Sequence, residues 1–60
     1  MKVGDLVRSV NNETHQKFGY GLVVELSIHH VRPNAKVLWL RYRGEMNPRW
    51  MYTGVLEIVE

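Results

Sequence analysis

The segment Ala35–Tyr42, Ala-Lys-Val-Leu-Trp-Leu-Arg-Tyr, constrains the fold more than any other part of the sequence. It is the most strand-like stretch, and it carries apolar side chains on both of its alternating faces. The second strand-like segment, Gly21–Ile28, has a period of two, which predicts one apolar face formed by Leu22, Val24, Leu26 and Ile28. We expect these two segments to pair at the centre of a small sheet.

The first twenty residues predict one short strand and a long loop. Gly4–Asp5 is typical of a turn, and the strand after it is expected to point Val3 and Val7 inward. Asn11–Lys17 is polar and without periodicity, so it is predicted to be a loop of the kind that often carries function. The two glycines of Phe18–Gly21 favour a bend or bulge where the chain returns to the sheet.

The remaining segments predict three further features of an all-β fold. His29–Asn34 ends the second strand at a Pro-Asn turn, and Arg43–Pro48 forms the next connection. Arg49–Tyr52 and Leu56–Val59 are predicted as the fourth and fifth strands, with Thr53–Gly54 between them as a one-turn 3₁₀ element. Because no segment has a sustained helical period, we expect a single domain over residues 1–60, a small five-stranded antiparallel barrel.

Size and composition limit how such a domain is stabilised and where it works. A chain of 60 residues buries only about 60 % of its unfolded surface. It has no cysteine, so neither a disulfide nor a thiolate metal site is available, in keeping with a reducing compartment. The first residues lack the apolar run of a signal peptide, and Val37–Leu40 is too short to span a bilayer. We expect a soluble cytoplasmic protein, assisted by self-association.

The charges are unevenly distributed along the chain. Residues 32–49 contain five cations and one anion, a net charge of +4, whereas the rest contains three cations and five anions, a net charge of −2. This asymmetry indicates an anionic partner. The alternative is that these are ordinary solvated side chains on short strands.

The residues that usually carry catalysis do not form a recognisable pattern. The sequence has no cysteine nucleophile, no glycine-rich phosphate loop and no carboxylate pair at a diagnostic spacing. His29 and His30 are adjacent, so on a strand they would point to opposite faces and could not bind one metal ion together. His15 could join one of them only through the folding of its loop. We therefore expect no enzyme activity, no cofactor and no metal ion.

An aromatic and basic set of residues predicts a surface for nucleic acid or another anionic partner. Proteins that bind single-stranded nucleic acid stack bases on aromatic rings and hold phosphates with cations. The candidate binding residues are Lys36, Arg41, Arg43, Arg49, Trp50 and Tyr52, and the wider aromatic set includes Phe18, Tyr20 and Tyr42. In the alternative, most of these rings complete the core and arginine stems cover their edges.

A second candidate surface follows from strand alternation. If Val37 and Trp39 point inward, then Leu38, Leu40 and Tyr42 share the outward face. Large apolar side chains exposed together usually mark an interface, so this face predicts pairing with a protein partner or with a second copy of the chain. In the alternative, the face is covered within one monomer by Val55, Leu56 or the long loop.

Four segments carry a recognisable pattern: Val3–Val7, Gly21–Glu25, Lys36–Trp39 and Leu56–Val59. Together they resemble very small SH3-like barrel proteins of unknown function from bacteriophages and marine metagenomic samples. The resemblance covers most of the chain except its loops and implies an SH3-like barrel. It also implies that Gly4, Asp5 and Gly21 are turn and bend residues, and that the core contains Val7, Val23 or Val24, Val37, Trp39 and Ile58.

Two better-defined groups with this barrel differ from the chain at their functional motifs. Peptide-binding SH3 domains open with a motif like Ala-Leu-Tyr-Asp-Tyr and have acids clustered in their first long loop. Here Asp5–Ser9 takes the place of that motif and the loop holds only Glu13, which argues against recognition of proline-rich peptides. Type II dihydrofolate reductases, which are tetramers around a central pore, have the active-site motif Val-Gln-Ile-Tyr. The nearest segment here, Trp50–Tyr52, does not match this motif.

The sequence therefore predicts a non-catalytic small binding or assembly module. Its most favoured partner is a protein, either a second copy of the chain or another protein. Weak nucleic-acid binding through the basic and aromatic set is the first alternative, and an oligomeric reductase is the second. Small barrels carry many unrelated functions, so the fold alone does not decide among these.

Overall fold

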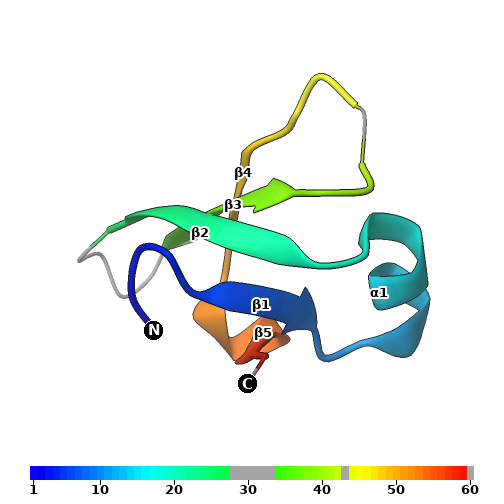
Figure 1. Ribbon diagram of the computed structural model, residues 1–60, viewed down its shortest axis with the longest axis horizontal. Coiled ribbons are helices and arrows are strands. Elements are labelled where there is room, and N and C mark those ends of the chain that lie inside the picture. The colour runs from blue at the N-terminus through cyan, green and yellow to red at the C-terminus, as the bar shows by residue number, and fades with distance from the viewer. Residues whose placement is uncertain (28–33, 43, 60) are drawn as a thin grey trace.

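The computed structural model describes residues 1–27, 34–42 and 44–59, and these form one antiparallel sheet with a short helix at one end (Figure 1). The helix joins the first two strands, and a 3₁₀ turn joins the last two. In chain order the elements are β1 (Leu6–Ser9), α1 (Asn12–Phe18), β2 (Gly21–Leu26), β3 (Ala35–Trp39), β4 (Arg49–Met51), η1 (Thr53–Val55) and β5 (Leu56–Ile58).

The strand order across the sheet is β4-β3-β2-β1-β5. Strands β1 to β4 therefore form a meander, and β5 returns to pair with the free edge of β1. The prediction of five antiparallel strands is confirmed, as is the 3₁₀ turn before the last strand. The sheet is not closed, because the short strands β4 and β5 are its two edges and do not pair with each other in the described part of the chain. Figure 1 shows β4 crossing behind β2 and β3 at a steep angle, as expected of a twisted sheet.

The core lies on the inner face of the sheet, where the three longest strands meet. Val7, Val23, Val37 and Trp39 are almost completely buried, and Ala35, Phe18 and Leu56 complete the cluster. Gly21 packs closely against this cluster. A Cβ at this position would come within 2.8 Å of Trp39 Cε3 and even closer to Val37. The expectation that Gly21 is a bend residue is therefore wrong, since it is a position of close packing inside β2.

The prediction of which residues of β2 form its inward apolar face is also wrong. Val23, not Val24, is the core residue, and Leu22, Val24 and Leu26 are each more than one-third exposed. The register explains this result, because Gly21 and Val23 lie opposite the buried Trp39 and Val37, respectively. A bulge after Val23 then shifts the pairing of the rest of β2. Ile28 lies outside the described residues.

Two other expected inward residues are exposed. Val3 is 58 % exposed, since it lies in the turn before β1 that Asp5 N closes by donating to Lys2 O. This bond confirms the predicted turn at Gly4–Asp5. Ile58 is opposite the buried Val7 but is 46 % exposed, because β5 is an edge strand with no further strand beside it among the described residues.

Residues 11–17, predicted to be a loop, contain most of the helix α1. Asn11 caps this helix, and its Oδ1 accepts a hydrogen bond of 3.1 Å from Thr14 N. The helix ends at Phe18, and Gly19 caps it with a φ of 71°, a conformation that glycine adopts easily. A helix of seven residues is unstable alone, so the burial of Phe18 in the core explains why it forms here.

Candidate functional site

Three leucines form a row across the outer face of the sheet. In the strand register Leu6 of β1 lies opposite Leu22 of β2, and Leu22 lies opposite Leu38 of β3. Residues directly opposite in neighbouring strands share one face of a sheet, and this face is opposite to the core. The three side chains are 36–38 % exposed. We call Leu6, Leu22 and Leu38 the leucine row.

Tyr20 and Leu40 extend this apolar surface at one end. Leu40 N donates a hydrogen bond of 2.9 Å to Tyr20 O, which continues the β2–β3 ladder by one pair. Tyr20 is 44 % exposed and Leu40 is 66 % exposed. The prediction that Leu38 and Leu40 point outward is confirmed.

Tyr42, the third residue of the predicted interface, is elsewhere. Its ring meets the Phe18 ring edge-on at 5.0 Å, and it packs against the core cluster. The reason is that β3 ends at Trp39, so strand alternation does not extend to residue 42. Leu56 also belongs to the core cluster, so it does not cover the leucine row as the monomeric alternative proposed.

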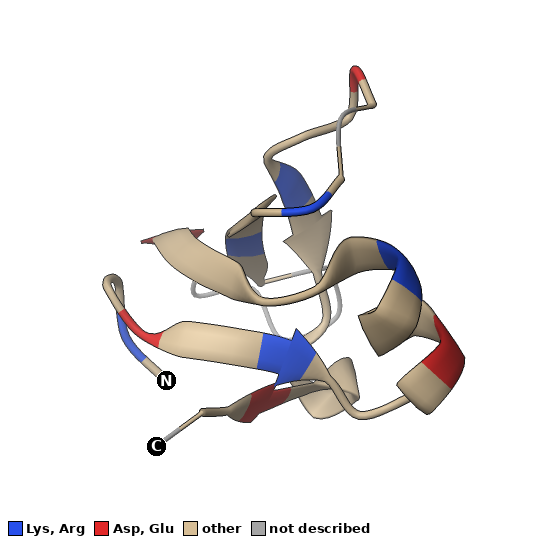
Figure 2. Cartoon of the chain, turned by 45° about the vertical axis from the view of Figure 1, so that its right-hand side comes forward, with Lys and Arg blue, Asp and Glu red and all other residues tan. Residues whose placement is uncertain are grey.

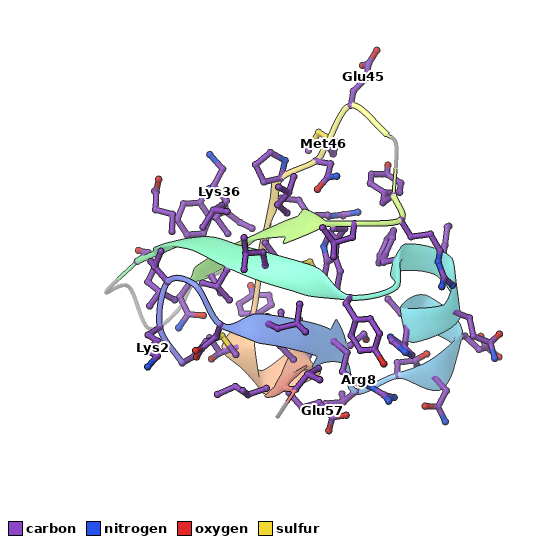
Figure 3. The ribbon with its side chains drawn as sticks, viewed as in Figure 1. Lys2, Arg8, Lys36, Glu45, Met46 and Glu57 are labelled. Atoms are coloured by element: carbon purple, nitrogen blue, oxygen red, sulfur yellow. The ribbon has the colours of Figure 1, made fainter. Side chains whose placement is uncertain are left out.

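The charged residues on the outer face are balanced in sign. Arg8 and Glu57 are cross-strand partners, with 3.0 Å between Nε and Oε1. Lys36 lies opposite Glu25 on one side and Trp50 on the other. Figure 3 shows Arg8 and Glu57 together near β1, and Lys36 extending on the side of the molecule away from α1. This face therefore carries apolar side chains without a strong net charge.

The predicted nucleic-acid set does not form one surface. Lys36 and Trp50 are on the outer face, where Lys36 Nζ is 6.0 Å from the centre of the Trp50 ring. Arg49 lies opposite the buried Val37, so its side chain is directed to the inner face. Arg43 is outside the described residues. The last of the set, Tyr52, is an exposed residue that follows β4.

Three cations instead gather where α1 ends. Lys17 Nζ is 6.0 Å from the centre of the Phe18 ring, and Arg49 Cζ is 5.7 Å from the same centre. Arg41 Nη1 donates a hydrogen bond of 2.9 Å to Gln16 O in the last turn of the helix. Ring faces and helix carboxyl ends both attract cations, which explains this local arrangement. We call Lys17, Arg41 and Arg49 the basic corner. In the view of Figure 2 the blue segments after β3 and in β4 are neighbours, with the blue segment of β3 to their left and that at the end of α1 to their right.

A hollow opens beside the basic corner. Its volume is about 390 Å³, and it is lined by Gly19, Tyr20, Leu40 and Arg41. The Tyr20 ring contacts the His15 ring edge-on at 5.1 Å, so the helix supports the position of this wall. An aromatic ring, an aliphatic side chain and a guanidinium therefore meet at one place.

Sequence reasoning missed the role of Asn47. Its amide accepts a hydrogen bond of 2.8 Å from Trp39 N and donates bonds of 2.8 Å and 2.9 Å to Trp39 O and Tyr42 O. Asn47 thus fixes the base of the β3–β4 connection, while Glu45 and Met46 extend at its tip (Figure 3). Glycine and proline marked this connection, but the sequence gave no signal that the Asn47 amide would bind backbone groups five and eight residues before it.

Neither metal chemistry nor known proteins identify the site. In the described ranges there is no group of three potential metal ligands, and His29 and His30 lie outside them. No helix of the described chain has the length and apolar character needed to cross a membrane. Comparison of the chain with protein-family models, curated proteins and solved structures found no match.

Proposed function

We propose that the protein is a small SH3-like binding and assembly module without catalytic activity, and that its partner is a second copy of itself. The barrel assignment is supported by the edges of the sheet. Only Tyr52 and η1 lie between β4 and β5 in the chain, so the two edges are held near each other, as in a partly open barrel.

The leucine row carries the proposal of self-association. Burying one leucine stabilises a protein by about 1.5–3 kcal/mol, and a domain of this size has a core that is close to the limit of stability. The row is suited to a two-fold pairing, because Leu22 lies at its centre and can stack on the same residue of the second copy. Leu6 of one copy then meets Leu38 of the other.

Charge and area favour a second copy over a charged partner. The outer face pairs Arg8 with Glu57 and Lys36 with Glu25, so two such faces do not repel each other. A stable interface buries about 800 Å² on each partner. The accessible surface of the chain is 4453 Å², so the dimer has to use most of one face, including Leu40, rather than the row alone.

The test replaces Leu38 and Leu40 with threonine, which is well tolerated in strands. Sedimentation velocity over a range of concentrations should show the wild-type mass rising from 7.1 kDa toward twice that value. The L38T/L40T variant should remain a folded monomer with a dispersed amide NMR spectrum.

The matched control is V3T/M46T, which removes two exposed apolar side chains that lie outside the five strands. This variant should associate like the wild type. A wild-type protein that stays monomeric at millimolar concentration would contradict the proposal, and so would unchanged association of L38T/L40T.

A further inference from the structure

We propose that the basic corner and the hollow beside it bind single-stranded nucleic acid, with a base stacked on Tyr20 and phosphates bound by Lys17, Arg41 and Arg49. The cations lie outside the leucine row, but Tyr20 and Leu40 also belong to the apolar surface that the proposed dimer uses, so nucleic acid and the second copy compete for this end of the outer face. The proposed site also differs from the surface expected from the sequence: it keeps Tyr20 from the wider aromatic set, adds Lys17, and excludes Lys36 and Trp50.

The first argument is that like charges converge without acidic partners. Lys17 and Arg49 both lie within about 6 Å of the centre of one Phe18 ring. Among the described residues the salt bridge is between Arg8 and Glu57, so none of the three cations of the basic corner is paired with a carboxylate. Cations on one side of a molecule and without a neighbouring carboxylate attract a polyanion.

The cations are also oriented by contacts that leave donors free. Arg41 uses one N–H group for Gln16 O, and a guanidinium has five such groups. Arg49 is half-buried and lies against the face of the Phe18 ring, a contact that uses no hydrogen-bond donor. Both side chains are thus positioned while most of their N–H groups remain available for phosphate oxygens.

The hollow explains why the partner is nucleic acid rather than a simple anion. Tyr20 is 44 % exposed and is supported on one side by His15, so its ring is a ready platform for stacking. Leu40 supplies an apolar wall, and Arg41 supplies a cation at the same hollow. A flat ring next to a cation matches the alternation of base and phosphate along a single strand. In a duplex the bases are already stacked, so Tyr20 would have no role.

The experiment measures the anisotropy of a labelled oligothymidine of about ten nucleotides at low salt. We expect R41Q/R49Q to weaken binding at least tenfold and to flatten the plot of log affinity against log salt by about 1.4, or 0.7 for each lost phosphate contact. The matched control K2Q/K36Q has the same net charge but leaves the basic corner intact, so it should bind within about threefold of the wild type.

The stacking step is tested by Y20T, with Y52T as control, because both tyrosines are exposed. Loss of one stacked base should weaken binding by about 5- to 150-fold for Y20T, with little change for Y52T. Equal loss in K2Q/K36Q and R41Q/R49Q would overturn the site. Binding of duplex DNA or polyglutamate as tight as that of oligothymidine would show that the basic corner attracts polyanions in general, and would overturn the proposal that it binds single-stranded nucleic acid.

Arg41 and Arg49 also contact the helix and the core, so a variant could lose stability. An amide-resolved NMR titration of the wild-type protein avoids this difficulty. Shifts should concentrate at residues 17–20, 40–41 and 49, and shifts centred on residues 36 and 50 would overturn the proposal. The titration is made at a protein concentration at which sedimentation shows the monomer, so the second copy does not cover Tyr20 and Leu40 and the two functions are judged separately.

Discussion

The leucine row and the basic corner are built in different ways. The row consists of three residues in adjacent strands, and backbone pairing alone puts them side by side. The corner combines the end of α1, a residue beyond β3 and a residue of β4, and in the described part of the chain these meet through Phe18 and Gln16. Alternation within one strand can therefore predict part of the first kind of surface, as it did for Leu38 but not for Leu22, whereas the second depends on how the ends of separate elements pack.

The two regions also differ in the forces that they offer a partner. The row is apolar and lies among balanced charges, so its contacts depend on burial and are little affected by moderate salt. The corner carries unpaired cations, and its contacts weaken as salt screens them. Leu40 borders both, because it extends the row and lines the hollow.

The largest effect should come from a change that breaks both regions together. Gly21 lies between Tyr20 and Leu22, and a Cβ at this position would clash with Val37 and Trp39 in the core. We expect Gly21→Ala to lower the free energy of unfolding by about 3 kcal/mol, as overpacked cores do. In a domain of this size the unfolding temperature should then fall by more than about 10 °C.

Thermal unfolding followed by circular dichroism measures this change. Gly54→Ala is the matched control, since a Cβ at Gly54 would meet no atom within 4 Å. It should unfold near the wild-type temperature. A Gly21→Ala protein as stable as this control would show that the contact of β2 with Trp39 is looser than described.

A smaller effect should separate the two regions. Asn47 is bonded to Trp39 N, Trp39 O and Tyr42 O at the base of the β3–β4 connection. Asn47→Ala leaves these backbone groups without their partner, which should cost about 2 kcal/mol. The connection leads to Arg49, so we expect oligothymidine binding to weaken more than self-association.

Hydrogen exchange provides the direct readout for Asn47→Ala. The amide of Trp39 should exchange faster than the lower free energy of unfolding alone would cause. The amides of β1 and β2 should lose only the protection that follows from that lower free energy. Asn12→Ala is a suitable control, because Asn12 is exposed and accepts a bond only from Arg8 in the described contacts. Uniform loss of protection across the sheet would show that Asn47 supports the whole fold rather than one region.

The same contrast decides how much the sequence could predict. Alternation in Ala35–Trp39 correctly gave Val37 and Trp39 as inward and Leu38 as outward, because each residue of a regular strand changes face. Strand alternation failed at Val23 in β2, where apolar residues on both faces made the buried face ambiguous. It also failed at Tyr42, which lies beyond the end of β3. The helix at residues 12–18 was missed because its stability comes from Phe18 in the core and not from an apolar periodicity. The sequence also could not predict that Lys17 and Arg49 lie near the same ring, because this contact depends on how Phe18 packs in the core.

The smallest effect concerns the charge balance of the outer face. Arg8 and Glu57 are exposed by 29 % and 52 %, so their ion pair is well screened by solvent. We expect Glu57→Gln to change the free energy of unfolding by less than about 0.5 kcal/mol. Thermal unfolding of this variant should differ little from that of Glu45→Gln, which makes the same change of net charge at the tip of the β3–β4 connection.

Sedimentation sharpens the comparison of Glu57→Gln with Glu45→Gln. In Glu57→Gln an unbalanced Arg8 on each of two facing sheets should weaken self-association slightly at low salt and not at high salt. Weaker association of Glu45→Gln to the same degree would trace the effect to net charge rather than to the outer face, and a stability loss above about 1 kcal/mol in Glu57→Gln would make the pair a structural element of the β1–β5 ladder.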